Sequence, residues 1–270
     1  MRTSERALAA DPNLWSCMPD LLIVTLASGL AGFVDAIVGG GGLILVPTLF
    51  AVFPTAPPAT LFGSNKGASI WGTAWAMRQY AQRVGLNWPT LLPATAMALL
   101  GSLVGAWLVT QVPATPLRRA LPFVLLGVLA YTLVRKDLGR VHAPRLSPRA
   151  ERLAAMAIGG VIGWYDGFFG PGTGSFFVFL FVRWLGYDFL HASASAKLLN
   201  TATNAAAIAL FATKGHVWWH VAAAMAVANV AGAWLGSRLA LRHGAGFVRQ
   251  VFLLVVGALI LRSGYDALRL

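Results

Sequence analysis

Long apolar runs separated by short polar connections dominate this chain. Between Leu21 and Phe53 the only charged residue is Asp35, and residues 88–117 carry no charge at all. Both runs exceed the about 20 apolar residues that a helix needs to cross a bilayer. Similar runs recur to the end of the chain and predict eight spans, four in each half, at 21–53, 59–77, 89–110, 119–135, 153–182, 189–213, 217–237 and 247–261. The expected fold is an all-α, polytopic integral membrane protein.

The first and fifth runs are each too long for one straight helix. A continuous helix over residues 21–53 would measure about 50 Å, whereas the hydrocarbon core of a bilayer is about 30 Å thick. Four consecutive glycines at 39–42, with Pro47 close behind, mark the expected break, because glycine destabilises a helix by about 1 kcal/mol relative to alanine. The stretch GFFGPGTGSFF, which starts at Gly167, predicts a second break at 170–174.

Unwound backbone is tolerated at membrane depth only where protein buries it or where it lines a watery cavity. Each half is therefore expected to contribute one broken helix to a polar centre. The N-terminus of the helix that restarts after each break would attract an anion. The alternative explanation for glycine is close helix packing, which small residues also permit. That explanation is preferred for two pairs with the spacing of packing motifs, Gly101 with Gly105 and Gly232 with Gly236.

Four full charges lie inside the apolar runs, although a charge at the bilayer centre costs at least about 2.5–3.5 kcal/mol. They are Asp35 and Lys66 in the first half and Asp166 and Lys197 in the second, and each aspartate precedes its lysine by 31 residues. One interpretation is two structural pairs, Asp35 with Lys66 and Asp166 with Lys197. In the other interpretation the lysines bind an anionic substrate, and the aspartates pair with the lysines or carry protons.

The two halves also share one register. Adding 131 to the positions of Asp35, Gly39, Ser64 and Lys66 gives Asp166, Gly170, Ser195 and Lys197. This match predicts a tandem duplication, and secondary transporters often place their substrate where two internal repeats meet. Eight full crossings would make the repeats parallel, whereas re-entrant glycine segments would make them inverted. The distribution of Lys and Arg scarcely separates these alternatives, and analogy with other transporters favours inversion.

Composition narrows the function classes further. Hydrophobic residues make up 57% of the chain and charged residues 11%. The basic residues lie in connections between the runs, so the net charge of +12 predicts membrane orientation rather than nucleic-acid binding.

Segment 1–20 is polar and lacks the features of a cleaved leader. Segment 136–152 is basic and is expected to be a cytosolic linker between transmembrane repeats at 21–135 and 153–270. Because Cys17 is the only cysteine, intrachain disulfides are excluded, and no metal site or cofactor is expected.

Two pairs of motifs, GFVDAIVGGGGLILVP with GSNKGAS and GWYDGFFGPGTGSFF with SASAKLLNTATN, resemble the signatures of the sulfite exporter TauE/SafE family. The likeness extends from about Leu21 to Leu268. It implies a polytopic inner-membrane permease that exports small sulfur oxyanions such as sulfite, sulfonates or sulfoacetate. Three departures leave the exact anion open: Ser64 stands where the family often has threonine, Ala196 takes the repeat position of Asn65, and Pro171 interrupts the second glycine run.

Together these arguments predict an anion site between the two breaks. Its expected substrate-binding residues are Gly39, Gly40, Gly41, Gly42, Ser64, Asn65, Lys66, Gly170, Gly172, Thr173, Gly174, Ser195, Lys197, Asn200 and Asn204, with Asp35 and Asp166 for proton coupling or charge pairing. The favoured function is alternating-access transport of a small anion, with the lipid bilayer as the other partner and a homo-oligomer left open.

Two other functions compete with transport. A membrane enzyme is disfavoured because the sequence lacks HExxH, GxSxG and phosphate-loop motifs, and because its five histidines lie mainly in connections. A membrane assembly factor with a purely structural polar centre is the remaining alternative.

Overall fold

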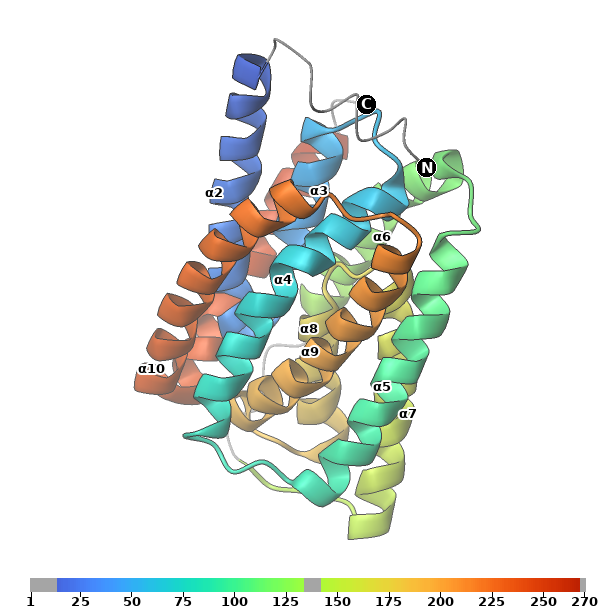
Figure 1. The fold of residues 1–270 in the computed structure, drawn as a ribbon. Helices are drawn as coiled ribbons and strands as arrows, with labels where there is room; N and C mark the ends of the chain where they lie inside the picture. The colour runs from blue at the N-terminus through green and yellow to red at the C-terminus, as the bar shows by residue number, and fades with distance from the viewer. Residues whose placement is uncertain (1–13, 134–141, 268–270) are drawn as a thin grey trace.

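The computed structural model describes residues 14–133 and 142–267, which form an all-helical bundle (Figure 1). Its elements are α2 (Leu14–Val38), α3 (Gly42–Val52), α4 (Pro58–Ala81), α5 (Trp88–Val109), α6 (Ala114–Leu133), α7 (Pro148–Phe168), α8 (Thr173–Leu180), the π-helical segment η1 (Phe181–Leu185), α9 (Phe189–Thr213) and α10 (Trp219–Ala267). The predicted polar segment 1–20 and linker 136–152 lie partly outside the described residues.

The all-α prediction is confirmed, and so is the position of both breaks. α2 ends just before Gly39, which has a φ of 81°, and α3 starts three residues further on, at Gly42. α7 and α8 are separated in the same way by a turn with Gly170 at φ 91° and Gly172 at φ 80°. Glycine adopts such positive φ values without the strain that other residues incur. The last two predicted spans join into α10, which bends at Gly244.

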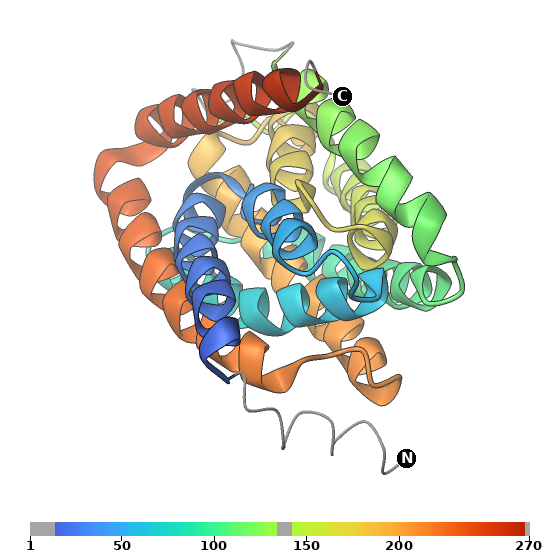
Figure 2. The same ribbon diagram turned by 90° about the horizontal axis from the view of Figure 1, so that it is seen from above.

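At each break the chain turns back instead of continuing across the molecule. A Cβ atom built on Gly41 would lie 2.6 Å from the carbonyl oxygen of Ala31, so α3 begins beside the last turns of α2. In the second half, the hydroxyl of Tyr165 donates to the carbonyl of Pro171 at 2.7 Å, and its ring contacts Phe176 edge-on at 5.4 Å. Figure 1 and Figure 2 show α3 lying beside α2. Each broken element is therefore a helical hairpin whose tip lies inside the molecule.

The two halves of the chain interlock. α5 packs along α7, and α10 packs along α2. A Cβ atom on Gly105 would lie 2.1 Å from the carbonyl oxygen of Trp164, and one on Gly232 would lie 1.9 Å from that of Gly29. The prediction that the two small-residue pairs serve close helix packing is thus confirmed. Each half supplies the helix that covers the first helix of the other half, so the halves are not two separately packed bundles.

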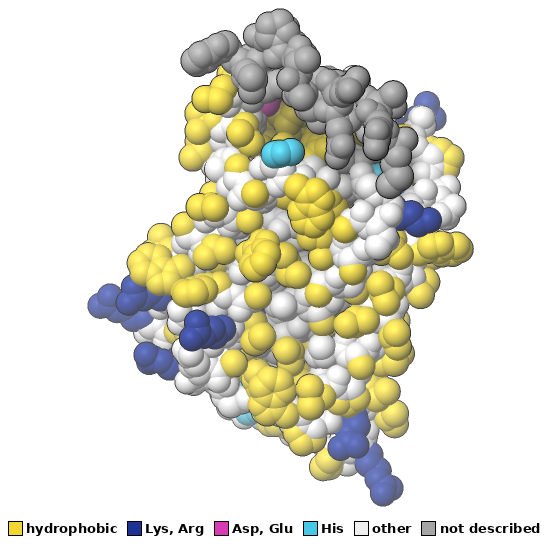
Figure 3. All heavy atoms as spheres, in the orientation of Figure 1, with side chains coloured by type: hydrophobic (Ala, Val, Ile, Leu, Met, Phe, Trp, Pro, Cys, Tyr) yellow, Lys and Arg dark blue, Asp and Glu magenta, His cyan; other side chains and the backbone are white. Residues whose placement is uncertain are grey.

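Apolar helices form the outside of the bundle. Three stretches in the described residues are long and apolar enough to span a membrane, namely Met18–Val38, Trp88–Val109 and Trp219–Gly244. Large apolar side chains such as Leu26, Val161 and Val227 are exposed. Figure 3 shows hydrophobic side chains spread over the face of the molecule, with Lys and Arg near its margins. An apolar surface of this extent is typical of contact with lipid.

The interior is polar along two helices, α4 and α9, which cross the centre of the bundle (Figure 1). Their buried polar side chains are Thr60, Ser64, Asn65, Lys66 and Thr73 in α4, and Ser193, Ser195, Lys197, Asn200, Thr203 and Asn204 in α9. Because buried polar groups need partners, these two helices place the candidate site at the centre of the molecule.

Candidate functional site

The two glycine breaks meet each other at the centre of the bundle. The backbone N–H of Ser175 donates to the carbonyl oxygen of Gly39 at 3.0 Å. A Cβ atom on Gly39 would lie 2.3 Å from the carbonyl carbon of Gly174, and one on Gly42 would lie 3.2 Å from the Cα of Pro171. Only residues without a side chain allow the two hairpin tips to approach this closely. As a result, the N-terminal ends of α3 and α8 face one shared region.

Two ion pairs hold the hairpin tips. Lys66 Nζ lies 2.6 Å from Asp166 Oδ2, and Lys197 Nζ lies 3.0 Å from Asp35 Oδ2. The second contact is an aligned hydrogen bond as well, whereas the first is an ion pair without that alignment. The side chain of Lys197 is fully buried, while that of Asp35 is 15% exposed. Charges buried to this degree are tolerated because each has an opposite charge beside it.

These pairs correct the pairing expected from the sequence. Asp35 with Lys66 and Asp166 with Lys197 were the expected partners, but each lysine pairs with the aspartate of the other half. The reason is the hairpin geometry. Because the two tips meet head to head, α4 passes the tip of the second hairpin, where Lys66 Nζ lies 3.3 Å from a Cβ position built on Gly170. The equal spacing of 31 residues in both halves carries no information about which aspartate is near.

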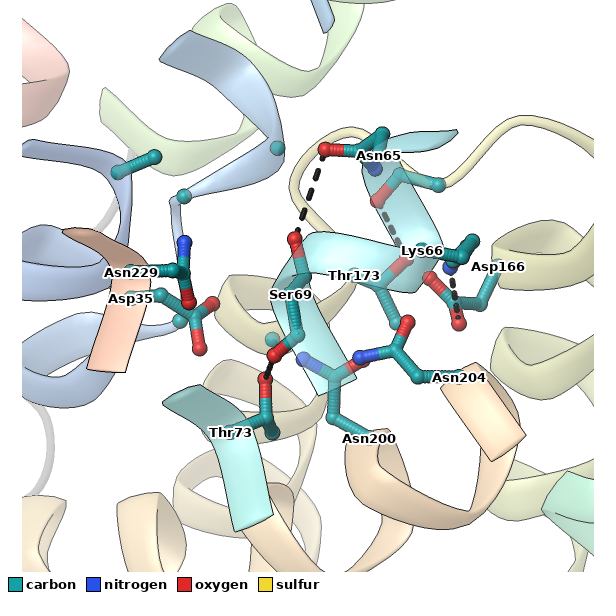
Figure 4. A pocket seen from close by; sticks show the side chains of 16 residues that line it. Asp35, Asn65, Lys66, Ser69, Thr73, Asp166, Thr173, Asn200, Asn204 and Asn229 are labelled. Atoms are coloured by element: carbon teal, nitrogen blue, oxygen red, sulfur yellow. Dashed lines mark hydrogen bonds and ion pairs between the residues drawn. The ribbon is translucent and has the colours of Figure 1, made fainter. Parts of the chain in front are cut away.

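A small cavity of about 20 Å³, room for about one water molecule, lies beside the hairpin tips (Figure 4). The predicted residues that line it are Gly39, Gly41, Gly42, Asn65, Lys66, Gly170, Thr173, Gly174, Asn200 and Asn204, together with Asp35 and Asp166. Figure 4 shows the side chains of Asn65, Lys66, Asn200 and Asn204 arranged around this space. The structure therefore brings most of the predicted site to one place.

Five predicted residues lie outside the lining of this cavity. Gly40 and Gly172 belong to the turns behind the tips. The hydroxyl of Ser64 accepts a hydrogen bond from the backbone N–H of Trp218 at 2.9 Å. Ser195 donates to the carbonyl of His191 at 2.8 Å and borders a different cavity. Lys197 reaches the site only through its ion pair with Asp35.

Four lining residues were not predicted: Ala31, Ser69, Thr73 and Asn229. For two of them the sequence holds a signal. Asn65, Ser69 and Thr73 are each four positions apart and so share one face of α4. Ser69 and Thr73 are also 131 positions before Asn200 and Asn204. Asn229 carries no such signal, because it enters the site through the packing of α10 on α2 and α4, where its Nδ2 donates to the carbonyl of Ser28 at 3.0 Å and its Oδ1 lies against Gly72.

The chemistry of the cavity suits a small anion. Lys66 supplies a full positive charge, and the amide groups of Asn65, Asn200 and Asn204 can donate hydrogen bonds. The N–H groups of Leu43, Ile44 and Leu45 already donate to the carbonyls of Gly40 and Gly41, but the dipole of α3 places partial positive charge at its glycine start, which lines the same cavity. Among the described residues that line the cavity, the negative groups are the carboxylates of Asp35 and Asp166, and each forms an ion pair with a lysine.

The fold and its polar centre define the class: a multi-pass helical membrane protein. Within that class, the chain belongs to the sulfite exporter TauE/SafE family, whose sequence profile matches residues 24–263. The family consists of membrane transporters and not of enzymes, so the expectation of a non-enzymatic membrane protein is confirmed.

Several relatives match over nearly their whole length. A probable membrane transporter protein from Sinorhizobium sp., ORF9, is 36% identical over 243 residues, which cover 90% of this chain and 91% of the relative. The probable membrane transporter protein YfcA of Escherichia coli K12 is 35% identical over 257 residues, or 94% of each chain. A probable membrane transporter protein from Haemophilus influenzae is 32% identical over 252 residues, covering 92% of this chain and 96% of the relative. No solved structure matches.

Proposed function

We propose that this protein is a secondary transporter that moves a small sulfur-containing oxyanion, such as sulfite, a sulfonate or sulfoacetate, out of the cell across the inner membrane. The observation that carries the proposal is the cavity at the hairpin tips, where Lys66 and the glycine-rich start of α3 line the same space. The family name points to sulfite, and the lining points to an anion of few atoms rather than a large ligand.

Binding of the anion would compete with Asp166 for Lys66. The side chains of Asp166 and Lys66 pair at 2.6 Å and are 2% and 4% exposed. An anion that takes over Lys66 leaves Asp166 buried without its partner, which is costly for a charged carboxylate. We therefore propose Asp166 as the group that carries a proton during transport. In this scheme the anion and one proton move in the same direction, and export is driven by an outward gradient of the anion.

Alternating access would follow from the opposed orientation of the two halves. In Figure 1, α2 and α4 start at one end of the molecule, whereas α7 and α9, which the 131-residue offset matches to them, start at the other end. Lys66 lines the cavity, while Lys197 is fully buried. We propose inverted repeats in which a second state exchanges these roles, so that the Lys197 half of the site opens to the other side. Segment 136–152 is proposed to lie in the cytoplasm.

Efflux from sealed vesicles tests transport directly. Purified protein is reconstituted into liposomes loaded with sulfite, and release is compared with protein-free liposomes. Protein-dependent release that saturates with internal sulfite is expected. The competing function, an assembly factor with a structural polar centre, predicts release equal to that of protein-free liposomes with every sulfur oxyanion tried.

A further inference from the structure

A second cluster of chemically active side chains lies at the start of α9, away from the anion cavity. Segment 142–147, which precedes α7 and is called the strap, is held there by backbone hydrogen bonds. The N–H of Ala143 donates to the carbonyl of Gly186 at 2.9 Å, and that of Arg145 donates to Leu185 at 3.3 Å. A Cβ atom on Gly186 would lie 2.2 Å from the carbonyl oxygen of Ala143, so the strap fits only against glycine. This contact brings His142 beside the first turn of α9.

The strap places two imidazole rings and a carboxylate together. The ring of His142 stacks on that of His191, with 4.1 Å between centroids. Asp188 caps α9, because its Oδ1 accepts from the backbone N–H of His191 at 2.7 Å, and its Oδ2 lies 2.9 Å from His191 Nδ1. One nitrogen of each imidazole and one oxygen of Asp188 all lie within 4.8 Å of one another.

These distances suit a metal ion. Two ligands on a tetrahedral zinc ion, each about 2.0–2.1 Å from the metal, are about 3.3 Å apart. The ligand atoms of Asp188 and His191 are 2.9 Å apart and need to separate by about 0.4 Å, and the spread of up to 4.8 Å among the three ligand atoms requires His142 to move by about 1.5 Å, which an exposed side chain can do. Three protein ligands leave one position for water. His142 is exposed, whereas Asp188 and His191 are half-buried, so ions reach the cluster from solvent.

The surroundings supply compensating negative charge. Glu151 lines the same small cavity as His142 and His191 and is itself 5% exposed. Its Oε1 accepts hydrogen bonds from the hydroxyl of Tyr187 at 2.5 Å and from Asn87 Nδ2 at 3.0 Å. Those contacts fix the carboxylate beside the cluster. Together with Asp188, it places two negative charges next to two imidazoles, which matches the charge of a divalent cation.

We propose that His142, Asp188 and His191 bind a divalent transition-metal ion, with Zn²⁺ the best match to two imidazoles and one carboxylate. The ion lies between His191 and Asp188, whose Nδ1 and Oδ2 are 2.9 Å apart, and clamps the strap to the start of α9. No metal site was expected from the sequence, since the chain has a single cysteine, and the two histidines come together only through the strap. None of the three residues lines the anion cavity, so this proposal is independent of the proposed function.

The test measures Zn²⁺ binding to the purified full chain after treatment with EDTA. Isothermal titration calorimetry is expected to show one Zn²⁺ per chain, and Zn²⁺ is expected to raise the melting temperature by mass action. His142→Ala and His191→Ala are each expected to weaken Zn²⁺ binding by at least about tenfold, the scale for disturbing a metal's ligand environment. His220→Ala, which removes an exposed histidine of α10, is the matched control and is expected to bind Zn²⁺ as the parent does.

Two results would overturn the proposal. The first is an absence of stoichiometric Zn²⁺ binding to the parent chain. The second is binding that persists unchanged in His142→Ala. That variant decides the matter even if His191→Ala fails to fold, because His142 is exposed and lies outside the helices. Magnesium, which prefers oxygen ligands, is expected to give no melting shift and serves as the ion control.

Discussion

At the scale of single residues, the partners of Lys66 decide how the site works. Lys66→Gln removes the charge that lines the cavity and is expected to weaken anion binding by about 1.5–3 kcal/mol, the scale for a lost charged hydrogen bond. This change corresponds to about a 10- to 150-fold increase in Kd. Anion-induced shifts in melting temperature measure it. Lys214→Gln, on an exposed connection, is the control that leaves binding unchanged.

The pairing of each lysine with the aspartate of the other half gives a second prediction. Lys66→Gln leaves Asp166 buried without a partner, which costs about 3–5 kcal/mol and lowers folded yield. The double variant Lys66→Gln with Asp166→Asn is expected to restore yield. Lys66→Gln with Asp35→Asn is expected to lower it further, because both Asp166 and Lys197 then lack partners. Size-exclusion chromatography compares the yields, and the reverse order would mean that the pairs are formed within each half.

Asp166 is also the residue where proton coupling is tested. If Asp166 carries the coupled proton, Asp166→Asn is expected to abolish flux driven by a proton gradient while anion exchange at equilibrium continues. The measurement is substrate flux into vesicles with and without an imposed pH gradient. Gradient-driven flux that survives in Asp166→Asn would rule out coupling at this carboxyl group.

At the scale of the elements, the hairpin tips are the sensitive feature. Gly39→Ala places a side chain at φ 81° and 2.3 Å from the backbone of Gly174, so it is expected to destabilise the fold by at least about 2 kcal/mol. Gly85→Ala is the matched control, because nothing lies within 4 Å of its Cβ position. Thermal unfolding in detergent compares them. Equal melting temperatures would show that the tips are not in close contact.

The helix breaks could be predicted from the sequence, whereas the tertiary contacts of the hairpin tips could not. Glycine and proline act on the local backbone, so the breaks at 39–42 and 170–174 were predictable to within a residue or two. Whether the chain then continues or turns back depends on tertiary packing, and so does the choice of aspartate beside each lysine. Asn229 was missed for the same reason, since its neighbours Ser28 and Gly72 are distant in sequence. Ser69 and Thr73 were missed although their spacing from Asn65 places them on one helix face.

At the scale of the whole molecule, the arrangement predicts where the chain ends lie. Figure 1 shows α7 starting at one end of the bundle and α10 finishing at the opposite end. With segment 136–152 in the cytoplasm, a reporter fused after Leu270 is expected on the outer side. Alkaline phosphatase fused there should be active and green fluorescent protein dark. A reporter found in the cytoplasm after Leu270 would contradict the inverted arrangement.

The cavity at the hairpin tips is proposed to bind the anion that the protein moves. Counterflow of labelled sulfite in sealed proteoliposomes tests it most directly, using the charge-free but folded variant Lys66→Gln with Asp166→Asn beside the parent chain and Lys214→Gln. Counterflow is expected in the parent and in Lys214→Gln, and none above protein-free liposomes is expected in the double variant. Counterflow at the parental rate in the folded double variant would show that Lys66 and Asp166 are a structural pair and that the anion passes elsewhere.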